Sequence, residues 1–225
     1  MNNKHIFWIA LVSALVIFWT GILVGVFFEN SRVSFIKETY FNSETDMFDF
    51  QLASQLSFGS NLTCKEINNK ASEFADKIYN QSVQLEKYDN SNKLTDQFIP
   101  IHKRYDLLRV SLWNEIIKNK GKCNSSINTV VYLYNYRDYS LNGRATQGAF
   151  GNYLGDLKNK YNDSIILIPI AADTGVESLN VIRASYNIDK TPVVIVNEKY
   201  KFESLESLKD INIQLDKNIK KISVK

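Results

Sequence analysis

The sequence predicts an α/β domain with a mixed sheet, preceded by a transmembrane helix and an α-helical hairpin. Three observations lead to this fold class. An uncharged apolar run covers residues 6–28, and two segments with apolar residues at helical spacing follow it. From Asn128, short runs of β-branched and aromatic residues alternate with helical segments in the order β-α-β-α-β-β-α. We therefore expect an anchor over residues 1–30, a stalk over 31–122 and the α/β domain over 123–225.

The overall composition is that of a folded protein. Hydrophobic residues make up 44% and charged residues 23% of the 225 positions, which is ordinary for a globular chain. The formal net charge is +3 and no arginine-rich run is present, so we expect no nucleic acid as a partner.

The apolar run at the N-terminus is long enough to cross a bilayer. A helix over residues 6–28 would measure about 34 Å, against a hydrocarbon core of about 30 Å. A cleaved signal peptide is the alternative, but its apolar region is shorter, about 7–15 residues, and Val26–Glu29 is a poor cleavage site. We expect a single-pass anchor with membrane lipid as its partner. Gly21-xxx-Gly25 has the spacing that lets membrane helices approach closely, which leaves a homodimer open.

Three helices are predicted between the anchor and Asn128. Residues 34–56 have an imperfect helical spacing of apolar side chains, and 58–61 break the pattern. A second helix is expected over 63–88, followed by a polar turn over 88–92. The third would begin at an N-cap, Thr95 or Asp96, and end at Gly121. A short polar connection predicts that these last two helices pack antiparallel as a hairpin.

The two cysteines stand at the two ends of this hairpin. Cys64 opens its first helix and Cys123 follows its second, so antiparallel packing would bring the two thiols together. A disulfide closing so long a loop would stabilise the fold by about 4 kcal/mol in the chain-entropy model, and it would persist only in an oxidising compartment. The bond therefore favours an extracytoplasmic domain with the N-terminus in the cytoplasm. The lysines and arginines that flank the anchor barely discriminate between the two orientations of the helix in the membrane. The alternative to the disulfide is two unpaired, buried thiols in a domain that faces the cytoplasm.

The α/β segment divides into seven elements. The strands are expected over 129–136, 164–172, 192–197 and 199–202, and the helices over 145–160, 176–186 and 204–215. A polar loop over 137–144 would connect the first strand to the first helix. The first connections should be right-handed crossovers over a mixed sheet.

The stretch from Tyr186 to Asn197, YNIDKTPVVIVN, resembles the thioredoxin family where the chain approaches and enters its cis-proline strand. The resemblance covers residues 128–215 and implies a thioredoxin-like domain with a cis bond at Thr191-Pro192. It also makes the second strand an edge strand, where Pro169 is tolerated. The whole arrangement is similar to membrane-anchored thioredoxin-like proteins of archaea, in which an anchor and a helical hairpin precede this core.

The cysteines of the family's redox motif are not in this sequence. Where Cys-x-x-Cys would stand, the chain reads Leu141-Asn142-Gly143-Arg144, which offers no thiolate for disulfide exchange. The two histidines, His5 and His102, have no second ligand at a zinc-like spacing. We therefore expect no metal, no cofactor and no catalytic residue, and an enzyme is not the leading interpretation.

The loop after the first predicted strand is the candidate binding surface. The resemblance places it beside Thr191-Pro192, where the family receives an extended peptide. Tyrosine and arginine are common in protein-recognition hot spots, and this loop contains Tyr136, Arg137, Tyr139 and Arg144. The leading hypothesis is a redox-inactive module that binds an envelope protein or an extended peptide. The alternatives are an envelope thiol-disulfide oxidoreductase or isomerase using Cys64 and Cys123 or a partner's thiols, a structural or oligomerising scaffold, and a merely solvated loop.

Overall fold

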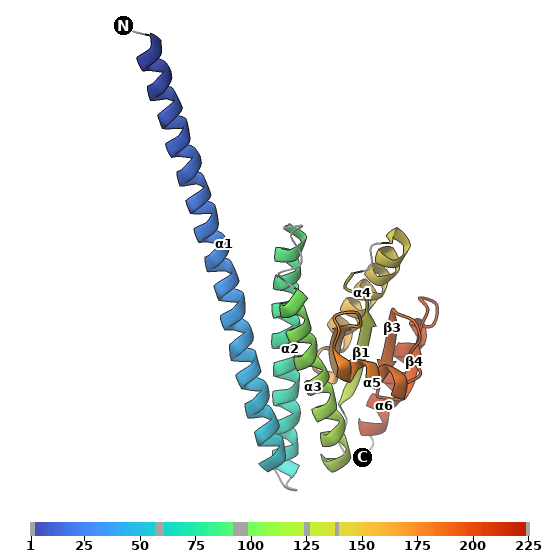
Figure 1. The fold of residues 1–225 in the computed structure, drawn as a ribbon. Coiled ribbons are helices and arrows are strands. Elements are labelled where there is room, and N and C mark those ends of the chain that lie inside the picture. Colours follow the sequence, from blue (N-terminus) through green and yellow to red (C-terminus); the bar gives the residue numbers. More distant parts are fainter. Residues whose placement is uncertain (1–2, 57–60, 92–98, 124–126, 138–139, 224–225) are drawn as a thin grey trace. The chain divides into compact units, whose positions relative to one another are not determined.

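The computed structural model describes residues 3–56, 61–91, 99–123, 127–137 and 140–223. The chain forms two compact units, Met1–Asn42 and Ser43–Lys225. The division falls inside the first helix, and the second unit contains both the helical hairpin and the sheet. Figure 1 shows the order of the elements along the chain.

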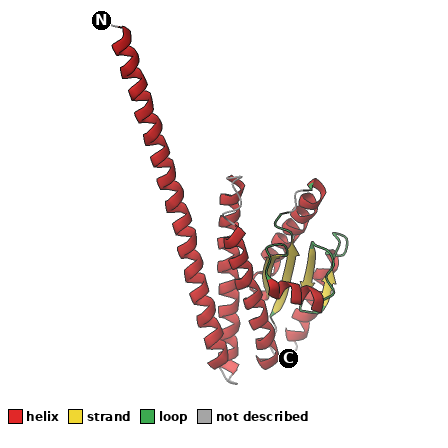
Figure 2. Ribbon diagram, viewed as in Figure 1, coloured by secondary structure: helices red, strands yellow, loops and turns green. Residues whose placement is uncertain are grey.

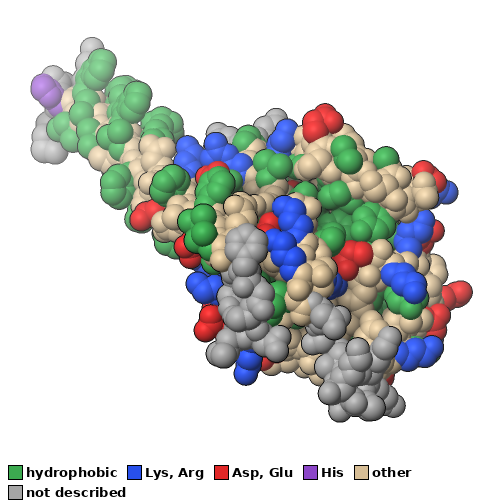
Figure 3. Space-filling view, turned by 90° about the horizontal axis from the view of Figure 1, so that it is seen from below, with side chains coloured by type: hydrophobic (Ala, Val, Ile, Leu, Met, Phe, Trp, Pro, Cys, Tyr) green, Lys and Arg blue, Asp and Glu red, His purple; other side chains and the backbone are tan. Residues whose placement is uncertain are grey.

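Helix α1 (Asn3–Leu56) is one continuous helix of 54 residues. We expected an anchor and a separate helix from residue 34. Residues 29–42 contain no proline or glycine, so nothing in their backbone interrupts the helix. Its N-terminal part is long and apolar enough to cross a membrane. Hydrophobic side chains cover that part of the helix, and those of residues 6–28 are solvent-exposed in the isolated chain (Figure 3).

The hairpin consists of α2 (Asn61–Ser91) and α3 (Ile99–Cys123), and each helix extends beyond its prediction. The polar turn that we expected over 88–92 is wrong for residues 88–91, because α2 continues to Ser91. The end expected at Gly121 is also wrong, because α3 continues to Cys123. One glycine inside a helix costs only about 1 kcal/mol relative to alanine, so a helix can continue through it. Residues 57–60 and the predicted N-caps Thr95 and Asp96 lie outside the described residues.

The predicted disulfide is confirmed. Cys64, in the first turn of α2, is bonded to Cys123, the last residue of α3, with their Cα atoms 5.6 Å apart. Because the bond joins the start of one helix to the end of the other, α2 and α3 run antiparallel.

The sheet is mixed and has four strands in the order β2-β1-β3-β4. The strands are β1 (Asn128–Tyr134), β2 (Ile165–Ala171), β3 (Val193–Val196) and β4 (Tyr200–Phe202). β1 pairs parallel with β2 and antiparallel with β3, and β3 pairs antiparallel with β4. Pro169 lies in β2 opposite Tyr132, and because β2 is an edge strand its missing N–H breaks no ladder.

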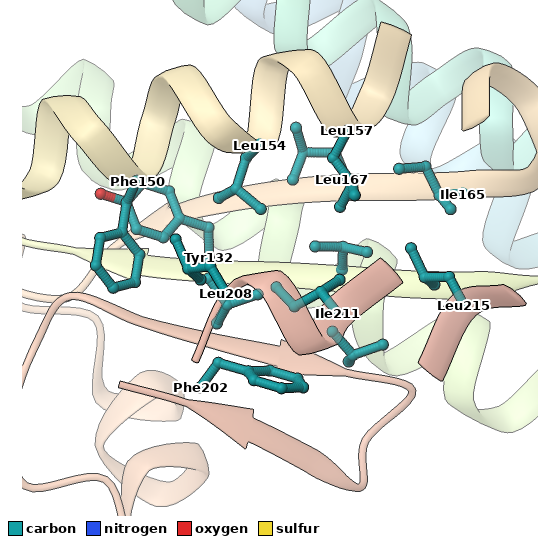
Figure 4. Close-up of a cluster of buried hydrophobic side chains, with 13 residues drawn as sticks. Tyr132, Phe150, Leu154, Leu157, Ile165, Leu167, Phe202, Leu208, Ile211 and Leu215 are labelled. Carbon is teal, nitrogen blue, oxygen red and sulfur yellow. The ribbon is translucent and has the colours of Figure 1, made fainter. Parts of the chain in front are cut away.

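Helices lie on both sides of the strands (Figure 2). α4 (Leu141–Tyr161) and α6 (Lys209–Ser223) pack on one face, where Phe150, Leu154, Ile211 and Leu215 meet alternate residues of the strands (Figure 4). α2 and α3 contact β2, and the side chains that point to the opposite face, such as Leu133, Ile168 and Ile195, are also buried. A short 3-10 turn (Asn162–Ser164) connects α4 to β2. α5 (Glu177–Ser185) then connects β2 to β3.

The last helix differs from its prediction over 204–215. Ser204 and Ser207 exchange hydrogen bonds, each backbone N–H donating to the other hydroxyl at 3.2 and 3.3 Å. This local turn delays the helix to Lys209, from where it continues to Ser223.

The β3–β4 turn anchors α3 to the sheet. Asn197 and Glu198 both have positive φ, 51° and 57°, as the two central residues of a type I′ turn require, and the backbone N–H of Lys199 closes this turn on the carbonyl of Val196 at 3.2 Å. Positive φ is an uncommon conformation for a glutamate. Glu198 accepts a hydrogen bond from Trp113 Nε1 at 3.0 Å and pairs with Lys120 Nζ at 2.8 Å. Burial lowers the pKa of Lys120, and the nearby carboxylate of Glu198 opposes that effect. The stalk is therefore bonded to the sheet rather than set apart from it.

Candidate functional site

The loop after β1 is held by a carboxylate from the end of β2. The backbone N–H groups of Tyr136 and Arg137 donate to Asp173 Oδ1 and Oδ2 at 2.7 and 2.8 Å. Because β1 and β2 are parallel, their carboxyl ends meet at one edge of the sheet, which brings Asp173 to the loop. Of the four residues predicted to bind a partner, Tyr136, Arg137 and Arg144 are described, and Tyr139 lies outside the described residues.

The loop lies beside Thr191 and Pro192, whose peptide bond is cis. Thr191 Oγ1 donates to Asn135 Oδ1 at 2.7 Å, and the backbone N–H of Asn135 donates to Gln147 Oε1 at 2.5 Å. Thr191 and Pro192 are half-buried and immediately precede β3, the neighbour of β1. The backbone N–H and carbonyl of Thr191 make no backbone hydrogen bond to any described residue. The structure thus brings the loop and the cis bond together.

Leu141–Arg144, the segment that the resemblance aligns with Cys-x-x-Cys, forms the first turn of α4. We expected Leu141–Arg144 to belong to the loop, but the helix begins at Leu141. Ser140 is the N-cap: its hydroxyl accepts from the backbone N–H of Gly143 at 3.0 Å, and its carbonyl accepts from that of Arg144 at 3.1 Å. Leu141 is 78% exposed, and Arg144 is exposed as well. The turn presents an apolar and a cationic side chain, and no nucleophilic thiol.

A histidine of α3 supports the loop from inside the molecule. The ring of His102 is buried and packs against the ring of Tyr136, with centroids 4.0 Å apart and planes tilted by 36°. Burial, and secondarily the positive charge of Arg109, lower the pKa of His102 to about 4. The imidazole is therefore neutral near pH 7. Sequence reasoning considered His102 only as a metal ligand and missed this packing role.

One turn further along α3, a buried ion pair ties the helix to the end of β2. Asp106 Oδ1 lies 3.0 Å from Arg109 Nη1, and both side chains are almost fully buried. Asp106 also accepts hydrogen bonds from the backbone N–H of Ala171 at 3.1 Å and from Thr174 Oγ1 at 2.9 Å. Burial raises the pKa of Asp106, with Arg109 and these hydrogen bonds acting in the opposite direction. The one available signal was the Asp-x-x-Arg spacing, which places both residues on one face of a helix.

Both cysteines are absent from this surface. They are bonded to each other at the end of α3, whereas the loop packs on its beginning. Among the described residues, no three His, Cys, Asp or Glu side chains gather closely enough to hold a metal ion. No protein-family model matches the chain, and no curated protein matches it.

Proposed function

We propose that this chain is a membrane-tethered, redox-inactive module with a thioredoxin-like fold that binds a protein or an extended peptide in the cell envelope. The proposal rests on the hydrogen bond between Thr191 and Asn135, which holds the loop after β1 beside the cis Thr191-Pro192 bond. The cysteines lie elsewhere, bonded to each other.

The arrangement of strands supports the fold assignment. The sheet order β2-β1-β3-β4, with one parallel and two antiparallel pairs, is compatible with the family resemblance. The helices on both faces and the cis X-Pro bond directly before β3 are compatible with it too.

Peptide binding is supported by the exposed chemistry around Thr191. An extended peptide gains affinity by main-chain hydrogen bonds to an open backbone and specificity from neighbouring side chains. Thr191 offers a backbone N–H and carbonyl, and Leu141 and Arg144 stand exposed on the first turn of α4. The carboxylate of Asp173 and the ring of His102 hold the loop in place before any partner arrives, which lowers the entropy cost of binding.

The proposed location rests on two features of the chain, the apolar segment of α1 and the disulfide. A membrane-spanning segment in α1 would fix the module to the bilayer, and a disulfide persists in oxidising compartments. An extracytoplasmic module with a cytoplasmic N-terminus satisfies both. We further propose dimerisation through Gly21 and Gly25. In one chain, a Cβ atom added at either glycine would meet nothing within 4 Å.

Surface variants of the full-length protein test the binding role. Leu141→Ser and Arg144→Ala change exposed side chains, so the fold should tolerate them. Partners are cross-linked in native membranes and quantified by mass spectrometry, with Lys122→Ala at the exposed end of α3 as the matched control. We expect loss of the captured partner with the first two variants only. Undiminished capture by the Leu141/Arg144 double variant would remove this surface as the binding site.

A further inference from the structure

Four Asn-x-Ser/Thr sequons occur in the chain, and they begin at Asn61, Asn80, Asn124 and Asn162. The structure describes the side chains of Asn80 and Asn162. We infer that Asn162 is an N-glycosylation site, which receives an oligosaccharide from a lipid-linked sugar phosphate. The inference rests on the extracytoplasmic location in the proposed function, because sequons are glycosylated in secreted and cell-surface segments. It does not depend on the proposed binding surface.

The two side chains that define this sequon are both accessible. Asn162 and Ser164 are exposed, and neither side chain forms a hydrogen bond with another described residue. The backbone of the turn is held instead, because the carbonyl of Asn162 accepts from Lys158 Nζ and that of Ser164 accepts from Asn128 Nδ2, both at 3.3 Å. A bulky, polar glycan on Asn162 would therefore displace no packed side chain.

Asn162 also lies where the backbone leaves a helix. α4 ends at Tyr161, and Asn162 is its C-cap, with a φ of 41°. Asparagine is several-fold enriched among residues with positive φ. The sequon then forms the short 3-10 turn before β2. The acceptor is therefore on a surface turn, the kind of segment in which sequons are used.

The sequon at Asn80 has a different setting. It lies in the middle of α2, with helical residues on both sides. The hydroxyl of its serine, Ser82, donates to the carbonyl of Tyr79 at 2.7 Å. Because that hydroxyl is bonded to the helix backbone and the segment is not a turn, we assign the glycan to Asn162 and not to Asn80.

The modification joins the side-chain nitrogen of Asn162 to the first sugar of the donor. Nδ2 attacks the anomeric carbon of that sugar, and the bond from this carbon to the phosphate oxygen of the lipid breaks. The lipid phosphate leaves with the bonding electrons. Nδ2 gives up one of its two protons, so the product is a neutral amide and no oxidant or reductant takes part.

The glycan would lie away from the candidate binding surface. Asn162 precedes β2, whereas Asp173, which holds the loop after β1, follows the end of that strand. The seven residues of β2, at about 3.3 Å each, separate the two positions by about 20 Å. A glycan at the beginning of β2 leaves the loop accessible, so the two proposals can fail separately.

Peptide mass spectrometry of full-length protein from native membranes tests the site. Trypsin cleaves after lysine and arginine, so the sequons at Asn162 and Asn80 fall in separate peptides. We expect a glycan on the peptide with Asn162 and none on the peptide with Asn80. Ser164→Ala should abolish the modification and Ser164→Thr should retain it, with Asn80→Gln as the matched control. Asn162→Gln is the second variant, because glutamine adopts positive φ less readily than asparagine.

An unmodified Asn162 in the wild type, or a glycan that persists in Ser164→Ala, overturns the inference. Protease added to cells with an intact cytoplasmic membrane, after removal of the wall, then tests the location. If the protease digests residues 43–225 while Asn162 is unmodified, the proposed location stands and only the glycan assignment fails. If these residues are digested only after the membrane is lysed, the domain faces the cytoplasm, and the proposed location fails together with the glycan assignment.

Discussion

The buried histidine beneath the loop makes stability depend on pH in a defined window. His102 has an ordinary pKa of 6.5 and a pKa of about 4 in the folded protein, because burial and Arg109 disfavour its charged form. The unfolded chain therefore binds a proton on His102 at pH values where the folded chain does not. This contribution to stability is complete above pH 6.5 and is lost as the pH falls towards 4.

The size of the effect follows from the difference between the two pKa values. Each unit corresponds to 1.36 kcal/mol, so the 6.5-to-4 shift removes about 2 kcal/mol by pH 5 and about 3 kcal/mol by pH 4. Asp106 acts in the opposite sense: its raised pKa contributes stability below its unfolded value, which is lost as the pH rises through the folded pKa. A comparison with a histidine variant isolates the His102 contribution, because the Asp106 contribution is largely common to both proteins.

The assay is urea unfolding of full-length protein in detergent, followed by fluorescence at pH 7.5, 6, 5 and 4. His102→Phe keeps an aromatic ring against Tyr136 and removes the titrating group. We expect the free energy of unfolding of the wild type to fall by about 3 kcal/mol more than that of the variant between pH 7.5 and 4. Parallel pH profiles for the two proteins would refute a buried, neutral His102.

Three further predictions concern the contacts that hold the helices and the sheet together, and each is measured as a change in the free energy of unfolding at pH 7.5. Asp106→Asn leaves Arg109 buried without its counter-charge and should cost about 3–5 kcal/mol; a cost under 1 kcal/mol would show that water reaches the pair. Glu198→Gln keeps the shape of the side chain but not its charge and should cost about 1–3 kcal/mol, whereas a neutral result would mean that the turn does not anchor α3. The Cys64→Ser/Cys123→Ser double variant should lose about 2–4 kcal/mol, and the wild type treated with reductant should match it; a reduced wild type as stable as the oxidised protein would contradict the role of the bond.

The arrangement of α3 changes how the stalk is understood. Its side chains cover one face of the sheet and bind both ends of it, through Asp106 at one end and through Trp113 and Lys120 at the other. The candidate loop therefore depends on a helix that lies before the α/β segment in the chain. A substitution in the hairpin is therefore expected to change the position of the loop through these contacts.

Local pattern was sufficient to predict most secondary structure. The β-branched runs around Val130, Ile166 and Val194 identified three buried strands, and the apolar stripes identified α2 and α3. The two cysteines at the ends of the hairpin predicted their bond. The periodicities are strong signals because they depend on residues close together in the chain. The bond was predictable because two consecutive helices that pack antiparallel bring their outer ends together.

Helix limits and helix faces were less predictable. The buried face of α1 within the second unit includes Ser43 and Ser54 beside Met47 and Phe50, while Phe48 and Leu52 are exposed. A hydrophobicity pattern therefore selects the wrong side of this helix. The two serines can be buried because their hydroxyl groups donate hydrogen bonds to polar side chains of α2 and α3, among them Gln81 and Glu115.

By itself, the sequence determined the elements, their order, an apolar segment long enough to span a bilayer, and a surface without thiols. Only the tertiary structure decided which residues surround that surface. His102 meets Tyr136 across 34 positions, Asp106 meets Ala171 across 65, and Trp113 meets Glu198 across 85. Contacts at such separations have no local periodicity to reveal them, because they form where helices and strands pack and not where residues follow one another in the chain.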